Sequence, residues 1–88
     1  MTMTAETAAA QIRRAYDLAG GRDWVAIVRL AEFVDLTPDQ MAAGVVHLAR
    51  TDQQVTIAPE SNQKTITPMG HLYAVRYGAQ ANHLIRWD

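Results

Sequence analysis

Residues 30–41 read Leu-Ala-Glu-Phe-Val-Asp-Leu-Thr-Pro-Asp-Gln-Met, and the predicted fold depends mainly on this segment. It contains the end of an apolar helical pattern, a short turn and a strong start signal for another helix. The helical pattern then continues to Arg50, and Val55 to Ala58 alternate as a short strand does. The middle of the chain is therefore predicted to run helix, turn, helix, strand.

The helix predicted over residues 37–50 has the clearest boundaries. Thr37 is a suitable N-cap, Gln40 can return its hydrogen bond in a capping box, and Pro38 occupies the first helical position, where its missing N–H costs nothing. Its apolar residues form one stripe for the core, with a polar face opposite: Met41, Val45 and Leu48, with Ala42 and Ala49 beside them. Gly44 costs about 1 kcal/mol against Ala in mid-helix, and close helix packing is its preferred explanation.

Two more helices are predicted before residue 37. The first spans residues 5–19 and ends at Gly20-Gly21. Its alanine-rich first turns have little to pack against, so they either fray or dock a second subunit. The next helix opens near Asp23 and is apolar around most of its circumference, which predicts a central helix with Trp24 and Phe33 in the core.

After the strand at 55–58, turn-forming residues fill positions 59–64. Thr67-Pro68 then predicts a short helix to about Tyr77, with Tyr73 and Tyr77 on one side and Gly78 as its stop. Residues 82–87 read as a closing strand, antiparallel to 55–58. One core is predicted to contain Leu30, Val45, Leu48, Val55, Ile57 and Ile85.

This order of elements predicts an α+β fold of the winged helix-turn-helix type: three helices followed by a small antiparallel sheet with an inserted short helix. A single domain covers residues 1–88, of which we expect 1–4 to be disordered. The spacing of the packing positions over about residues 23–58 resembles winged-helix bacterial regulators, including the MarR-like and ArsR-like groups: Leu30-Ala31, Asp35-Leu36-Thr37, Val45, Leu48 and Val55. Because these are packing positions, the resemblance concerns the fold more than the function.

Residues 59–67, with Gly78 and residues 83–85, are also similar to short uncharacterised winged-helix proteins of actinobacteria, which offer no function to transfer. The chain departs from ordinary members in two ways. Their wing is a plain hairpin, whereas a helix is predicted to interrupt it here, and no long C-terminal dimerisation helix follows.

Composition narrows the class of protein. The chain has 88 residues, 49% of them hydrophobic and 19% charged, and has no cysteine, which is ordinary for one small globular domain and excludes disulfides and thiolate metal sites. No run of about eighteen apolar residues is present, and the first residues lack the basic and apolar regions of a signal peptide. We therefore expect a cytoplasmic protein without membrane attachment.

The net charge of −1, from eight basic and nine acidic residues, is unusual for a nucleic-acid-binding domain. Such domains commonly carry an excess of Lys and Arg because phosphate neutralisation drives their affinity. Two interpretations of this charge therefore remain open: the basic residues form a local patch that binds DNA, or the partner is a protein in place of DNA.

The helix at 37–50 is the candidate for the major groove. Gln40 is suited to adenine, Arg50 to a phosphate or guanine, and His47 to either, while Thr37 and Ala43 complete the exposed face. Lys64 in the polar loop and Arg22 before the second helix are candidate phosphate contacts. The alternative is that Gln40 only caps the helix, His47 is solvated and Arg50 only stabilises the helix C-terminus.

Other chemistry is weakly supported. The three histidines, His47, His71 and His83, are not paired at helical spacing, so no metal site is expected, and His83 is predicted to be partly buried and to bind a backbone carbonyl. No nucleophile motif or phosphate loop is present, so the chain is not read as an enzyme and no cofactor is predicted. The aromatic residues are predicted to lie in the core, except Trp87, which is assigned to an interface.

The leading hypothesis is a bacterial winged-helix protein that binds double-stranded DNA as a homodimer, as a transcriptional regulator or a mobile-element accessory factor. The alternative is a winged-helix module that binds another protein through the 37–50 face or the C-terminal strand, without nucleic acid.

Overall fold

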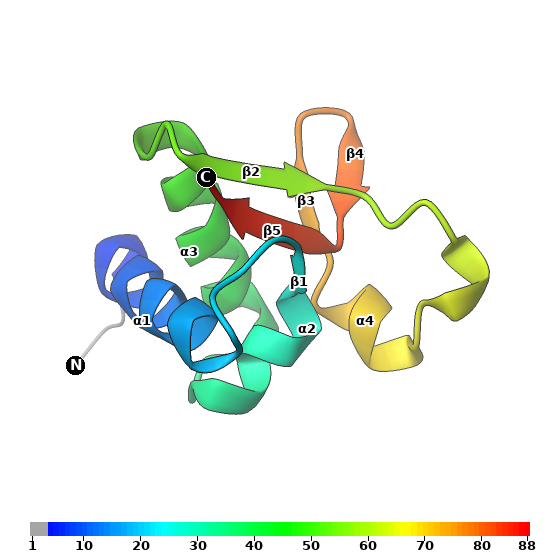
Figure 1. Cartoon of the computed structure of the whole chain (residues 1–88), viewed down its shortest axis with the longest axis horizontal. Helices are drawn as coiled ribbons and strands as arrows, with labels where there is room; N and C mark the ends of the chain where they lie inside the picture. The colour runs from blue at the N-terminus through cyan, green and yellow to red at the C-terminus, as the bar shows by residue number, and fades with distance from the viewer. Residues whose placement is uncertain (1–3) are drawn as a thin grey trace.

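The computed structural model describes residues 4–88, which form an α+β domain (Figure 1). Its helices are α1 (Ala5–Leu18), α2 (Ile27–Leu30), α3 (Pro38–Thr51) and α4 (Pro68–Leu72), with short 3₁₀ turns η1 (Ala31–Phe33) and η2 (Gln63–Thr65). Its strands are β1 (Val25–Ala26), β2 (Val55–Ala58), β3 (Val75–Tyr77), β4 (Gln80–Asn82) and β5 (Leu84–Trp87). The disorder expected at residues 1–3 lies outside the described residues, whereas Thr4 is the N-cap of α1.

Helix α1 ends one residue earlier than predicted, before Gly20 and Gly21, which both adopt positive φ. Its alanine-rich start packs within the domain, contrary to the expectation that it has little to pack against, and docking of a second subunit on its exposed side stays a prediction. Ala8 and Ala9 are buried, and a Cβ built on Gly44 of α3 would come within 3.0 Å of the Ala8 Cβ. The small side chains therefore let α1 and α3 pack closely, which confirms the explanation preferred for Gly44.

The long helix predicted from Asp23 is wrong. Asp23 has a φ of +59°, and Val25 and Ala26 form β1, which pairs with Ile85 and Leu84 of β5. Helical structure starts only at Ile27 and gives way to the 3₁₀ turn η1. Pairing with a strand distant in sequence overrides the local helical pattern, because it satisfies backbone groups that a helix would otherwise pair internally.

Trp24 and Phe33 are consequently not core residues. Their side chains are 37% and 39% exposed, respectively. The Arg86 guanidinium lies over the Trp24 ring, and that of Arg29 over the Phe33 ring. Both rings therefore lie at the surface beneath arginine side chains.

Helix α3 begins as predicted. The Gln40 N–H donates to Thr37 Oγ1 at 3.2 Å, and the Thr37 N–H donates to Gln40 Oε1 at 2.9 Å, which completes the capping box. Met41, Val45 and Leu48 are buried as one stripe. The predicted inward face is thus confirmed.

The main sheet has the strand order β1-β5-β2 and is antiparallel throughout. The strand predicted at 55–58 and its antiparallel pairing with the closing strand are confirmed. The closing strand is shorter than the predicted 82–87, because Asn82 belongs to β4. In the predicted core, Leu30, Val45, Leu48 and Ile85 are buried, and Val55 and Ile57 are half-buried against them.

The predicted helix from Thr67 to Tyr77 stops at Leu72. Val75–Tyr77 instead forms β3, which pairs with β4 in a hairpin whose turn contains Gly78 at a φ of +68°. Gly78 therefore turns a hairpin and does not stop a helix. Since Tyr73 precedes the hairpin and Tyr77 lies within it, the expectation that they share one helix face is wrong.

Candidate nucleic-acid interface

Five of the seven predicted contact residues lie on α3 or at its N-cap. Thr37, Ala43 and Arg50 are exposed, and Gln40 and His47 are half-buried. The helix has 14 residues, which corresponds to a length of about 21 Å and is sufficient to lie along a major groove. The structure therefore brings these five residues together along one helix.

The capping box limits what the start of α3 can offer to a base. Thr37 Oγ1 and Gln40 Oε1 already accept backbone N–H groups. Gln40 Oε1 keeps a second lone pair, and its amide nitrogen has no hydrogen-bond partner among residues 4–88. A bidentate contact with adenine is thus compatible with the capping box, provided that the same oxygen accepts twice.

The C-terminal half of α3 borders a shallow hollow that also includes Ala5 of α1. Ala43, His47 and Arg50 line it together with Val46 and Thr51, and Thr51 Oγ1 donates to the His47 carbonyl at 2.7 Å. Val46 was not among the predicted contacts, although its position three residues after Ala43 places it near the same face. Arg50 is the cation of this hollow and forms no ion pair within the described chain.

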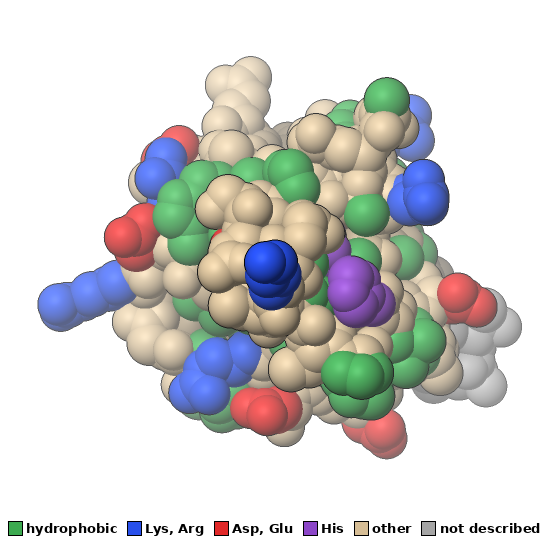
Figure 2. Space-filling model, turned by 90° about the vertical axis from the view of Figure 1, so that its right-hand side faces the viewer, with side chains coloured by type: hydrophobic (Ala, Val, Ile, Leu, Met, Phe, Trp, Pro, Cys, Tyr) green, Lys and Arg blue, Asp and Glu red, His purple; other side chains and the backbone are tan. Residues whose placement is uncertain are grey.

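Lys64 and Arg22 do not join this group on α3. Lys64 lies in η2, at the end of the long axis opposite α1, and Arg22 lies in the turn between α1 and β1 (Figure 1). Both side chains are exposed. Figure 2 views the end of the molecule that carries η2 and α4, and shows Lys and Arg side chains scattered among polar, apolar and histidine groups.

The arginines divide into paired and unpaired sets. Arg13 binds Asp17 at 2.7 Å, Arg29 lies 3.7 Å from Glu32, and Arg86 lies 3.0 Å from Asp88. The remaining five basic side chains are exposed and form no ion pair within residues 4–88: Arg14, Arg22, Arg50, Lys64 and Arg76. The unpaired charges are those that remain available to a phosphate.

Arg76 is a candidate that the sequence prediction missed. It lies on β3, which packs against α3, and its register partner is Ala81. The prediction placed it at the end of a helix. The alternation of Val75, Arg76 and Tyr77 before Gly78 is the signal that could have indicated a hairpin strand instead.

Acidic residues surround the start of α3. Asp35 and Asp39 are exposed and unpaired in the described structure, and Glu32 precedes them in η1. Carboxylates near a helix N-terminus stabilise the helix but repel a phosphate backbone. The C-terminal half of α3, with Arg50, is therefore the end better suited to a polyanion.

The histidines do not form a metal centre. Residues 4–88 contain no group of three or more His, Cys, Asp or Glu side chains arranged to hold a metal ion. His83 is buried, as expected, but its partner differs from the prediction: Nδ1 accepts the backbone N–H of Glu60 at 3.1 Å, and no carbonyl is bound by the ring. His71 approaches the His83 ring edge-on at 6.0 Å between centroids.

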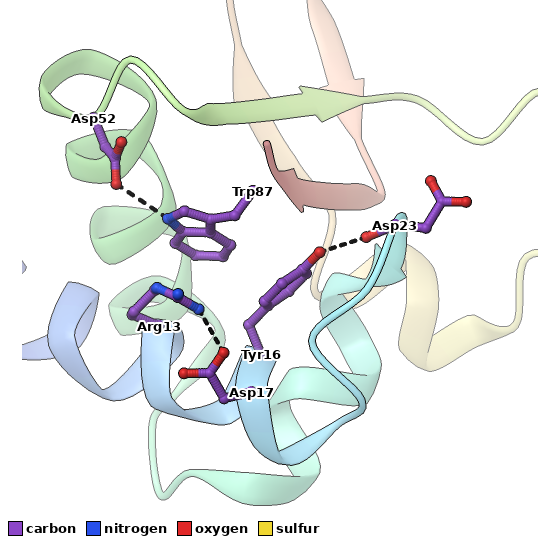
Figure 3. A network of polar contacts seen from close by, with 6 residues as sticks. All are labelled: Arg13, Tyr16, Asp17, Asp23, Asp52 and Trp87. Carbon is purple, nitrogen blue, oxygen red and sulfur yellow. Dashed lines mark hydrogen bonds and ion pairs between the residues drawn. The ribbon is translucent and has the colours of Figure 1, made fainter.

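Trp87 closes the C-terminus onto α1 (Figure 3). Its ring lies 4.8 Å from that of Tyr16 and 5.1 Å from the Arg13 guanidinium, and its Nε1–H donates to Asp52 at 3.0 Å. The Tyr16 hydroxyl donates to the Asp23 carbonyl at 2.6 Å. Trp87 is thus half-buried within its own chain, where it packs against α1, and the interface role expected of it stays a prediction.

Comparisons with known proteins gave no family. No protein-family model matches the chain, and neither the curated proteins nor the solved structures include a significant match. Within the described part of the chain, no helix has the length and apolar character needed to cross a membrane.

Proposed function

We propose that this chain is a winged-helix protein that binds double-stranded DNA, with α3 in the major groove. The observation that carries the proposal is the pairing of β2, which directly follows α3, with the closing strand β5. In a winged helix such an antiparallel pair directly follows the reading helix and is the element from which the wing extends, so the pairing supports α3 as the reading helix. Residues 59–83 then correspond to an enlarged wing that carries α4 and the β3–β4 hairpin.

The distribution of charge supports this proposal better than the net charge does. Three arginines are held by carboxylates, whereas Arg50, Lys64 and Arg22 are exposed and unpaired in the described residues. In the proposed complex, Arg50 contacts a phosphate or guanine from α3, and Lys64 and Arg22 contact phosphates on either side. Gln40 and His47 face base edges, and Thr37 and Ala43 allow the backbone to approach.

The biological role that fits such a domain is a transcriptional regulator or a mobile-element accessory factor acting as a homodimer. Two protomers double the small number of basic contacts. If each neutralises about three phosphates, the plot of log affinity against log salt concentration has a slope of about −5. Light scattering at high micromolar concentration tests the dimer, and a monomer there contradicts it.

The binding experiment is retention of genome-derived DNA fragments by the purified protein at about physiological salt. Arg50→Ala and Lys64→Ala are each expected to weaken binding and to make the salt slope shallower by about 1 for every phosphate that is no longer neutralised. Arg29→Ala is the matched control, because it removes one arginine that already faces Glu32. If both test variants bind like the control, the proposed contacts of Arg50 and Lys64 are wrong, and if no fragment is retained at low salt, DNA binding is excluded.

Sequence reading is tested separately at Gln40. Gln40→Glu keeps a carboxylate oxygen for the Thr37 N–H, and therefore the capping box, but removes the amide donor that adenine N7 needs. We expect the affinity for a mixed-sequence fragment to fall only by the small amount that one added negative charge causes. The preference for the selected site over that fragment is expected to fall as well. An unchanged preference assigns Gln40 to capping alone.

A protein partner is the second candidate function, and a specific surface favours it. Leu18 is 61% exposed and lines an open hollow with Phe33, Val34 and Arg14, between the end of α1 and η1. Exposed apolar side chains with a charged residue beside them are typical of protein-binding sites. The C-terminal strand β5 lies between β1 and β2, and β1 pairs with Leu84 and Ile85 only, so protein binding through this strand stays a prediction. Leu18→Glu distinguishes the two functions, since it alters this hollow and leaves α3 unchanged.

A further inference from the structure

A second feature of the molecule is a hollow of about 150 Å³. It lies between the helical part of the domain, which is residues 5–58 with β5, and the inserted segment, which is residues 59–83. Ala26 of β1 and Val28 of α2 line it together with Ile66 and Gly70 of the inserted segment, and with His83 and Leu84 where the chain enters β5. These residues come from three separate parts of the chain. The hollow therefore exists only because residues 59–83 fold back onto β1 and α2.

His83 is fixed in this hollow and presents one free donor. The residue is only 9% exposed, its backbone N–H donates to Ala58 O, and its carbonyl accepts from the Ile27 N–H. Because Nδ1 accepts the Glu60 backbone N–H, the proton of the neutral ring is on Nε2. Nε2 has no hydrogen-bond partner within residues 4–88. Since the only fully buried side-chain atom without a partner in these residues is Arg86 Nε, the His83 Nε2 atom is accessible to solvent.

Glu60 supplies the complementary acceptor. One carboxylate oxygen, Oε1, accepts the Asn62 N–H at 3.1 Å, and the other has no partner among the described residues. At the rim, Thr65 Oγ1 donates its proton to Asn62 O, whereas Thr67 Oγ1 accepts the Gly70 N–H and keeps its own O–H as a further donor. His83 Nε2 is thus an unpaired donor and the second Glu60 oxygen an unpaired acceptor, both on residues that line the hollow, and Ala26, Val28, Ile66 and Leu84 add apolar side chains to the same lining.

We propose that this hollow is a binding site for a small neutral ring compound that has a hydrogen-bond donor beside an acceptor, as in a cyclic amide. The volume is that of a cavity that admits benzene, so the ligand body has about six ring atoms. Its carbonyl accepts from His83 Nε2–H, its N–H donates to the Glu60 carboxylate, and its ring faces Val28 and Ile66. The proposal does not rest on DNA binding.

Occupancy of the site has a structural consequence. Because the ligand contacts Val28 of the helical part together with Ile66 and Gly70 of the inserted segment, it ties the inserted segment to the helical part. A ligand that binds the closed arrangement alone raises the free energy of opening it. Amide hydrogen exchange in residues 63–74 is therefore expected to slow on binding.

The test is an NMR titration of the full ¹⁵N-labelled chain with 2-pyridone, in the absence of DNA. We expect saturable shifts at Val28, Ile66, Gly70 and Leu84 with a dissociation constant on the order of 1 mM, which is appropriate for a ligand of this size. N-methyl-2-pyridone keeps the carbonyl but lacks the N–H, and is expected to bind at least about tenfold more weakly, equivalent to the loss of one hydrogen bond.

Two variants complete the test. Glu60→Gln keeps an oxygen for the Asn62 N–H but removes the charge, and is expected to weaken 2-pyridone binding about tenfold, since hydrogen bonds to charged groups are the stronger ones. Glu6→Gln makes the same change at the exposed start of α1 and is expected to leave binding unchanged. The proposal is overturned if 2-pyridone gives no saturable shifts, if the N-methyl compound binds equally, or if Glu60→Gln binds like Glu6→Gln.

Discussion

The helical part and the inserted segment of this domain are stabilised in different ways. The helical part, residues 5–58 with β5, contributes nearly all of the buried apolar side chains, whereas residues 59–83 contribute Val75 alone among those described. The inserted segment instead buries the polar residues Asn82 and His83, and it leaves Met69, Leu72 and Tyr77 exposed. One region is stabilised mainly by apolar packing and the other mainly by local hydrogen bonds.

Because of this difference, the two regions need not have the same free energy of unfolding. Apolar burial contributes about 25 cal/mol per Å² and is shared across α1, α3 and the sheet, whereas hydrogen bonds exposed to water contribute little net free energy. Segments with few buried apolar contacts open first. We expect residues 59–82 to exchange their amide hydrogens before the core does.

The largest expected effect is at Leu48. Leu48→Ala removes a buried side chain of α3 and is expected to lower the free energy of unfolding by about 2 to 5 kcal/mol. Leu72→Ala makes the same change in α4, where the side chain is 56% exposed, and is expected to cost less than about 0.5 kcal/mol. Urea denaturation measures both, and similar losses would abolish the distinction between the two regions.

The next effect concerns the polar centre of the hairpin. The Asn82 side-chain nitrogen donates to the carbonyls of Val75 at 3.0 Å, Gln80 at 3.3 Å and Tyr77 at 3.4 Å. Asn82→Ala leaves these groups without this donor and is expected to cost about 1 to 3 kcal/mol, because unsatisfied buried polar groups are expensive.

Hydrogen exchange in β3 and β4 is the measurement for Asn82→Ala, with exchange in α1 as the internal reference. Gln80→Ala is the control, since Gln80 is exposed and its side chain donates only to Asn82 Oδ1. If Asn82→Ala accelerates exchange equally in α1 and the hairpin, the two regions unfold as one unit.

A smaller effect is expected at the contact between α1 and α3. An exposed Gly→Ala change in a helix gains about 1 kcal/mol, but at Gly44 the added Cβ would lie 2.6 Å from Ile12 Cδ1 and 3.1 Å from the Ala8 carbonyl carbon. Overpacking costs about 1 to 3 kcal/mol, so Gly44→Ala is expected to lose about 1 kcal/mol net.

A double-mutant cycle sharpens the Gly44 prediction. Ile12→Val removes the Cδ1 atom that the new Cβ meets, and alone costs about 0.5 to 1.5 kcal/mol. In combination with Gly44→Ala it is expected to cost less than the sum of the two, because the contact is relieved. If the two losses are additive, the contact with Ile12 Cδ1 is not the cause of the destabilisation, and α1 and α3 instead move apart to accommodate Gly44→Ala.

The smallest expected effect compares two N-caps of the same kind. Thr37 Oγ1 accepts the Gln40 N–H at the start of α3, and Thr67 Oγ1 accepts the Gly70 N–H at the start of α4. Thr37→Ala is expected to cost about 1 kcal/mol of global stability. Thr67→Ala is expected to change the global value by less than about 0.5 kcal/mol, and to accelerate amide exchange mainly in residues 67–73. Equal global losses would place α4 in the same cooperative unit as α3.

The features that the sequence determined correctly depend on neighbours in the chain. The capping box of Thr37 and Gln40, the apolar stripe of α3 and the end of α1 before Gly20 are interactions within about four residues, so local pattern is sufficient to predict them. The α3 members of the candidate interface were predictable for the same reason. They follow directly from the position of the helix and its inward stripe.

The remaining features could be known from the tertiary structure alone, because they depend on strand partners that lie beyond the spacing of one helical turn. Val25 and Ala26 are strand residues because β5, about sixty residues later, supplies their hydrogen bonds, and this shortens the predicted central helix and exposes Trp24. In the hairpin, β3 is a strand because Val75 pairs with Asn82, only seven residues later, which moves Arg76 from a predicted helix to a hairpin beside α3. The local sequence allows helix or strand at both places, and the pairing with another strand selects the strand.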